Sequence, residues 1–243
     1  MFCSNCGGFL RPKYPPKPTP PRGKPYGKKP PEIKPLSPSE PVNIQTLFAE
    51  FNMLPPIVYG EGIVRQNSTL WITERRRVYK EFREKFSSDK LTSVGKLCED
   101  YEQFLYFRNN LSWTTLYRTG LEALKQPERL WDLITFIQDE SIDIRQRINK
   151  GLRGELHVKG IGKNILTALL HTLHPDNYGV WNNRTKETLE ILRRSPSIGH
   201  DLGLTYLAVN EKLLQLCKEL DTDLTTIDGL MWYVSKRVSP KLI

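Results

Sequence analysis

The sequence predicts an all-α fold, and three observations lead to this prediction. From about residue 43 to the C-terminus, apolar residues recur at spacings of three and four, the period of an amphipathic helix. No run of alternating apolar and polar residues is long enough to indicate a sheet. Aromatic residues make up 10% of the chain, enough for a packed core although total hydrophobic content is only 38%.

The 243 residues divide into three segments of different composition. Residues 1–10 contain a cysteine pair, residues 11–42 are rich in proline and basic residues, and residues 43–243 carry the helical periodicity. A chain of this length holds one full domain plus smaller additions. We therefore expect a small head, a linker and one helical domain.

The head contains Cys3-Ser4-Asn5-Cys6 followed by two glycines, and it resembles half of a zinc ribbon. Two thiolates on such a tight turn can face one metal ion, but a structural zinc site needs four ligands. Cys98 and Cys217 stand alone in apolar helical patterns, so we predict core positions for them. Cys3 and Cys6 are the predicted zinc ligands. A histidine, a second chain or a protein partner would complete the site; the other interpretation is a degenerate knuckle that binds metal weakly or not at all.

The linker holds 12 of the 18 prolines of the chain. Residues 1–42 also contain eight Lys or Arg against two Asp or Glu, so most of the net charge of +9 lies there. This composition predicts an extended, semi-rigid spacer. We also expect it to attract DNA or RNA phosphates weakly, with Tyr14 and Tyr26 able to stack on bases.

The helical domain begins with a short predicted helix that Pro55-Pro56 ends, followed by a longer one that Ser68 caps. Within the second helix, Arg75-Arg76-Arg77 either contacts phosphates or points to different sides of the helix. Further helices are predicted over residues 90–108, 112–126, 128–139, 142–152, 163–174, 185–194, 204–220 and 223–238.

Between two of these helices lies the most informative stretch, Lys159-Gly160-Ile161-Gly162-Lys163. Glycines let the backbone bend sharply and approach a partner closely. The turn leads into a helix N-terminus, whose free amides and dipole attract anions. With a lysine on each side, the predicted anion is a nucleic-acid phosphate.

Spacing excludes two other glycine-rich phosphate motifs. A dinucleotide-binding fingerprint needs a third glycine three residues after Gly162, where Ile165 stands. A nucleotide-hydrolase phosphate loop needs a glycine five residues before the Gly-Lys pair, where His157 stands.

The stretch over residues 141–195 resembles the helix-hairpin-helix, endonuclease III-like superfamily of DNA glycosylases. In that family a hairpin of this kind is followed by a loop, a catalytic aspartate and a new helix; here the turn at Pro175-Asp176-Asn177 leads to Asn182-Asn183-Arg184. The resemblance implies an all-α, glycosylase-like domain over residues 43–243. It also implies phosphate contacts from Lys159, Gly160, Ile161, Gly162, Lys163 and Arg184.

The catalytic positions depart from the family pattern. The lyase lysine aligns with Asn164 and the catalytic aspartate with Asn182. Asparagine neither forms a Schiff base nor carries the charge that stabilises a sugar cation. We therefore predict DNA binding without standard glycosylase chemistry. The alternatives are a glycosylase or lyase that uses Asp176 as acid or Lys163 as nucleophile, and a protein-interaction module.

Other residues near the turn have simpler interpretations. Trp181 fits a core position better than stacking on an extruded base, and Asn182 or Asn183 suits a helix cap. His171 and His174 lack a nearby acid or thiol that would complete a metal site.

Composition also bounds the location. No apolar run approaches the roughly 18 residues of a membrane span, and the N-terminus lacks a signal-peptide core. Four cysteines do not form a disulfide framework pattern. We expect an intracellular protein, cytoplasmic or associated with the nucleoid or nucleus, not secreted and without a membrane partner. Its partner would be DNA, with RNA left open.

Overall fold

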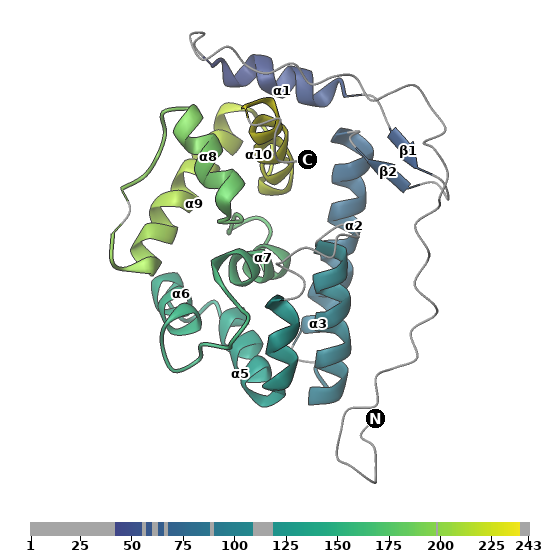
Figure 1. Ribbon diagram of the computed structural model, residues 1–243, viewed down its shortest axis with the longest axis vertical. Coiled ribbons are helices and arrows are strands. Elements are labelled where there is room, and N and C mark those ends of the chain that lie inside the picture. Colours follow the sequence, from purple (N-terminus) through teal and green to yellow (C-terminus); the bar gives the residue numbers. More distant parts are fainter. Residues whose placement is uncertain are drawn as a thin grey trace.

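The computed structural model describes residues 42–54, 57–59, 63–65, 68–87, 90–108, 119–197 and 199–238. The cysteine pair and residues 11–41 of the linker lie outside this part of the chain, so the predictions made for them stay predictions. The described residues are mainly helical, as predicted (Figure 1). In chain order the elements are α1 (Ile44–Asn52), β1 (Ile57–Tyr59), β2 (Ile63–Arg65), α2 (Ser68–Phe86), α3 (Val94–Arg108), the 3-10 helix η1 (Leu121–Lys125), α5 (Pro127–Gln138), α6 (Ile144–Leu152), α7 (Lys163–Leu173), α8 (Asn183–Ile191), α9 (Leu202–Glu219) and α10 (Leu224–Val238).

Two elements differ from the sequence-based expectation. β1 and β2 form a small antiparallel hairpin in which Ile57 pairs with Arg65. Each strand has only three residues, too few for an alternating pattern to stand out. The helix predicted over residues 112–126 is helical where it is described: residues 119–120 are α-helical and residues 121–125 form a 3-10 helix.

The central element is α7, which Figure 1 shows surrounded by the other helices. Every residue from Ile165 to Leu173 is buried. A helix that is apolar all round is expected to be enclosed in this way. Its two buried threonines are satisfied within the helix, because Thr167 donates to the Lys163 carbonyl at 2.7 Å and Thr172 to the Ala168 carbonyl at 2.8 Å.

Aromatic side chains fill the space between α2 and α3. The rings of Phe82, Phe86 and Phe104 have centroids 5.7 to 5.9 Å apart. Cys98 and Cys217 are buried free thiols, which confirms their predicted core positions. Burial raises their pKa to about 11 and about 12, so both are protonated at neutral pH.

The packing of α6 against α9 depends on Gly203 and Asp201. A Cβ atom on Gly203 would lie 2.5 Å from the Arg145 carbonyl oxygen, so the two helices approach closely only because this residue is glycine. Asp201 caps α9 by accepting from the Leu204 amide at 2.9 Å. Its carboxylate also accepts from Arg145 Nε at 2.8 Å and Asn149 Nδ2 at 2.9 Å, which ties the two helices together.

These hydrogen bonds give a prediction for acid unfolding. The Leu204 amide, then Asn149 and Arg145, hold the pKa of Asp201 well below its ordinary value of 3.8. The stabilisation is therefore complete above that ordinary value and is lost as the pH falls towards the folded-state pKa. Asp201→Asn keeps a good cap but removes the titrating charge. We expect its melting temperature to fall less than that of the wild type between pH 5 and pH 2.

The control is Glu84→Gln, which removes an exposed carboxylate from α2 and should follow the wild-type curve. Parallel melting curves of wild type and Asp201→Asn across this range would contradict the role assigned to Asp201.

None of the helices that the structure describes combines the length and the apolar character that crossing a bilayer requires.

Candidate nucleic-acid interface

The turn that precedes α7 is anchored by two apolar side chains. Val158 and Ile161 are 0% and 1% exposed, and the Ile161 amide donates to the Val158 carbonyl at 3.0 Å. The predicted contact residue Ile161 therefore points its side chain into the core. Only its backbone remains for a ligand.

The two glycines of the turn have different physical roles. Gly160 has φ of +96°, a backbone conformation that residues other than glycine rarely adopt. A Cβ there would also clash with the Thr119 carbonyl oxygen. The same Cβ would lie 3.0 Å from Glu122 Cβ. Gly162 has φ of −95° and no atom within 4 Å of where its Cβ would be. The fold thus requires glycine at 160 but not at 162.

Gly162 is the N-cap of α7 and offers no side-chain cap. The Ile165 and Leu166 amides donate to the Gly162 carbonyl at 3.1 and 3.0 Å. Within the described residues, the amides of Gly162, Lys163 and Asn164 have no hydrogen-bond acceptor. Three adjacent donors at the positive end of a helix dipole form a place where an anion can bind.

Lysines from three elements surround this helix end. Lys163 Nζ lies 5.0 Å from the centre of the Trp181 ring. The pKa of Lys163 is lowered mainly by burial and, to a smaller extent, by repulsion from Lys186 on α8. Lys159 is exposed in the turn. Sequence analysis did not identify Lys186, because nothing in the spacing shows that the start of α8 returns to the start of α7.

Thr167 connects the start of α7 to the segment that precedes α8. Its buried hydroxyl donates to the Lys163 carbonyl and accepts from the Trp181 amide at 2.9 Å. Trp181 is 5% exposed and packs against Tyr206, with ring centroids 6.3 Å apart. The pocket beside it has a volume of about 30 Å³, room for roughly one or two water molecules. Trp181 is therefore a core residue and does not line a base-sized pocket.

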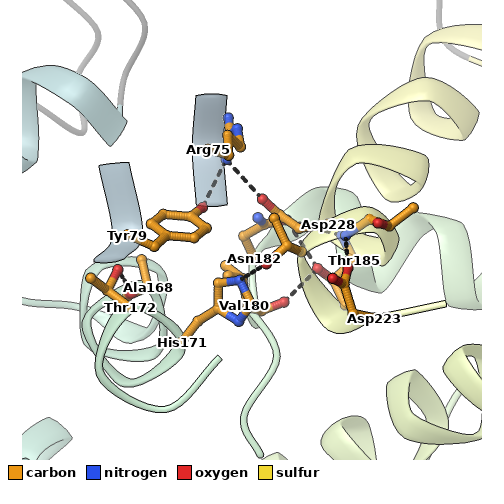
Figure 2. Close-up of polar contacts among 12 residues, drawn as sticks. Arg75, Tyr79, Ala168, His171, Thr172, Val180, Asn182, Thr185, Asp223 and Asp228 are labelled. Carbon is orange, nitrogen blue, oxygen red and sulfur yellow. Dashed lines mark hydrogen bonds and ion pairs between the residues drawn. The ribbon is translucent and has the colours of Figure 1, made fainter. Parts of the chain in front are cut away.

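Asn164 and Asn182, the two asparagines that the resemblance predicts at catalytic positions, have distinct surroundings. Asn182 caps α8 by accepting from the Thr185 amide at 2.9 Å, and the Thr185 hydroxyl donates to the Val180 carbonyl at 2.7 Å (Figure 2). Asn164 is half-buried, and its buried Oδ1 has no hydrogen-bond donor in the described part of the chain. The structure accounts for Asn182 as a cap, as predicted.

Asp176, predicted as a displaced acid, lies elsewhere. It is exposed in the turn after α7, at the helix end opposite Gly162. Ten rises of 1.5 Å separate the first and last residues of α7, so roughly 15 Å of helix stand between Asp176 and the open amides. The structure does not bring this carboxylate to the predicted phosphate site. Its position in the turn agrees with a role in the turn itself.

The arginine run on α2 is committed to ion pairs. Arg75 Nη1 lies 3.0 Å from Asp228 Oδ2 of α10 and 3.0 Å from the Tyr79 hydroxyl (Figure 2). Arg76 pairs with Asp223 at 2.7 Å, and Arg77 pairs with carboxylates of its own helix. The geometry therefore favours the interpretation that these arginines point to different sides of the helix.

His171 belongs to the same buried region. Its Nδ1 lies 2.8 Å from the Tyr178 carbonyl oxygen and its Nε2 lies 3.3 Å from the Thr225 hydroxyl. The Tyr79 ring meets it edge-on at 5.0 Å. His174 Nδ1 lies 3.5 Å from Glu140 Oε1, so the expectation that no acid lies near these histidines was wrong for His174. Both histidines have structural contacts, as expected, and the described residues contain no group of three or more potential metal ligands.

Comparison of the chain with models of protein families, with curated proteins and with solved structures found no match. The turn before α7, its open amides and the lysines around them therefore stand as the candidate site on their own geometry.

Proposed function

We propose that this protein binds DNA by holding backbone phosphates on the N-terminal amides of α7, in the manner of a helix-hairpin-helix. The observation that carries the proposal is the open space at Gly162. Glycine is itself a common N-cap, but unlike Ser, Thr, Asp and Asn it has no side chain to occupy the first amides. Packing does not require glycine here, and a glycine at this position lets a partner approach the backbone closely.

The charges around the turn favour phosphate over a neutral ligand. Lys159 is exposed in the turn, Lys163 begins α7, and Lys186 of α8 lies close enough to Lys163 to repel it, although Lys186 also lies 3.7 Å from Glu190. Arg184 is exposed in the first turn of α8. Such contacts position a protein on the nucleic-acid backbone and carry little sequence information. The proposed binding is thus largely independent of sequence, with the basic linker adding weak electrostatic attraction.

The proposal includes the absence of standard glycosylase chemistry. Asn164 and Asn182 replace the residues that would form a Schiff base and stabilise a sugar cation. The side-chain oxygen of Asn182 is also engaged in capping α8. The proposed activity is therefore the binding of DNA phosphates without excision of a base.

One observation favours a second candidate, an abasic-site lyase. The lowered pKa of Lys163 increases the fraction of unprotonated amine at neutral pH, and an unprotonated amine can attack the aldehyde of an opened abasic sugar. The attack would form an imine with loss of water and lead to strand cleavage.

A binding and turnover assay separates these candidates. Duplexes carrying uracil, oxidised purines, alkylated bases and abasic sites are titrated with the full chain between 50 and 200 mM salt, and released bases and nicks are measured. We expect binding to all duplexes without release or nicking. With three or four cations engaged, affinity should fall roughly 40- to 150-fold over this range.

Borohydride trapping on abasic DNA tests the lyase directly. A covalent complex that forms in the wild type and in Lys159→Arg but not in Lys163→Arg would replace our proposal by the lyase. If DNA does not bind even at 50 mM salt, both candidates are wrong, and a protein-interaction module becomes the better hypothesis.

A further inference from the structure

A shallow groove of about 630 Å³ follows the outer face of α5. Its apolar lining consists of the aromatic side chains of Trp131 and Phe136 together with two aliphatic ones. All four are partly buried, and Trp131, Phe136 and Leu156 pack against the core. The fourth apolar lining residue is Ile142. Packing against the core fixes the positions of the other three, while part of the surface of each faces the groove.

Two carboxylates also line this groove, which we call the α5 groove. Asp132 is exposed and has no ion-pair partner in the described part of the chain. Asp139 accepts from the Ser141 hydroxyl at 2.6 Å and the Ser141 amide at 2.9 Å, and these hydrogen bonds lower its pKa. The groove thus combines an aromatic surface with two carboxylates. Lys150 Nζ lies 5.6 Å from the centre of the Phe136 ring, and its charge is paired with Glu155 at 2.9 Å.

This chemistry selects a particular kind of ligand. Extended proline-rich segments bind in aromatic-lined grooves, because the polyproline II helix is preformed and loses little entropy on binding. Lysine or arginine beside the prolines would be attracted to Asp132 and Asp139 and to the face of Trp131. Nucleic acid does not fit, because its phosphates would be repelled by the same carboxylates.

The chain itself contains a segment of this composition. Residues 11–42 hold 12 prolines and eight Lys or Arg. Within them lies the stretch Pro12-Lys13-Tyr14-Pro15-Pro16-Lys17. Pro12 and Pro15 are three residues apart, and Lys17 follows Pro15 by two residues. A proline spacing of this kind places successive prolines on one face of a polyproline II helix, which has three residues per turn.

The segment is also long enough to reach the α5 groove from any side. Lys17 and Val42 are 25 residues apart, a span of up to roughly 75 Å in polyproline II geometry. A domain of about 200 residues has a diameter of only about 40 Å. Because the segment is tethered, its effective concentration near the groove is in the millimolar range, and even a weak site would be occupied.

We propose that the proline-rich basic segment of residues 11–22 docks in the α5 groove of its own chain. Prolines contact Trp131 and Phe136, and the lysines and arginines of the segment face Asp132 and Asp139. The inference does not rest on the proposed phosphate site at α7, because it concerns a different surface. Docking of residues 11–22 would compete with the weak attraction to DNA that we propose for the linker.

Photo-cross-linking of the full chain tests this contact. Tyr14→p-benzoylphenylalanine places a reactive ketone in the segment, and mass spectrometry of the irradiated monomer locates the products. We expect them in residues 127–142. Asp132→Lys, an exposed charge reversal, should lower the yield there roughly fivefold, the change that about 1 kcal/mol produces. Thr135→Arg, which obstructs the middle of the groove, should lower it similarly.

Glu211→Lys on α9 is the matched control, because it makes the same charge change at another exposed helix position and should leave the yield unchanged. Three outcomes would overturn the proposal: products spread over many elements, products concentrated on another surface, or yields in α5 that neither groove variant changes. Products that join two chains and increase with concentration would also overturn it and identify a second copy as the occupant.

Discussion

Gly162→Asp is expected to abolish most DNA binding while leaving the protein as stable as the wild type or slightly more stable. The backbone of Gly162 is extended, with φ of −95° and ψ of −176°, and a Cβ there would meet no atom within 4 Å. Aspartate is a preferred N-cap and would accept hydrogen bonds from the first amides of α7. It would thereby occupy the proposed phosphate position with a negative charge.

The size of the effect follows from the bonds that are lost. A hydrogen bond to a charged group contributes about 1.5–3 kcal/mol. Losing one or two of them, with added repulsion, should weaken binding of the full chain to duplex DNA by roughly 10- to 100-fold or more at 50 mM salt. Fluorescence anisotropy measures the affinity, and thermal unfolding measures the stability.

Gly95→Asp is the matched control for Gly162→Asp. Gly95 also lies in the first turn of a helix, α3, and a Cβ there also meets nothing within 4 Å. The variant makes the same change in net charge away from the lysines of the turn, so its affinity should stay within about twofold of the wild type. Equal losses in the two variants would show that net charge alone governs binding and that the α7 amides hold no phosphate.

Gly160→Ala should have the opposite profile, a large loss of stability. Its φ of +96° is strained for alanine, and the added Cβ would clash with the Thr119 carbonyl oxygen. Strain of this kind, together with a backbone clash that no rotamer relieves, costs about 2–4 kcal/mol. We expect the melting temperature to fall by roughly 5 to 15 °C.

Gly162→Ala is the control for this second variant, because it places the same methyl group two residues later in open space. Alanine is a poor N-cap, so a fall of only a few degrees is expected there. If Gly160→Ala melts within about 2 °C of the wild type, the turn is not fixed by the packing described. Calorimetry on the full chain gives both melting temperatures.

Most helices were predictable because each has an apolar face that repeats every three or four residues. The first and third predicted helices and those after residue 128 agree with the structure to within a few residues. The β1–β2 hairpin was not predictable, because strands of three residues are too short to establish a period. Residues 121–125 were predicted to be helical, but five residues are too few to distinguish a 3-10 helix from an α-helix.

The candidate site divides in the same way. Lys159, Gly160, Gly162 and Lys163 are neighbours in the sequence, so the turn and its link to a helix N-terminus were visible without a structure. The different roles of the two glycines were not, since Thr119, which excludes a side chain at Gly160, is 41 residues away in the sequence.

The sequence by itself determined the helical class, the Gly-x-Gly turn and the concentration of prolines and basic residues before residue 43. These depend on local periodicity, spacing and composition. Only the tertiary structure decided that Lys186 joins the turn, that Asp176 lies at the far end of α7, and that the arginine run on α2 is occupied by carboxylates. Each of these depends on where distant segments meet, which is set by packing around the buried α7 helix.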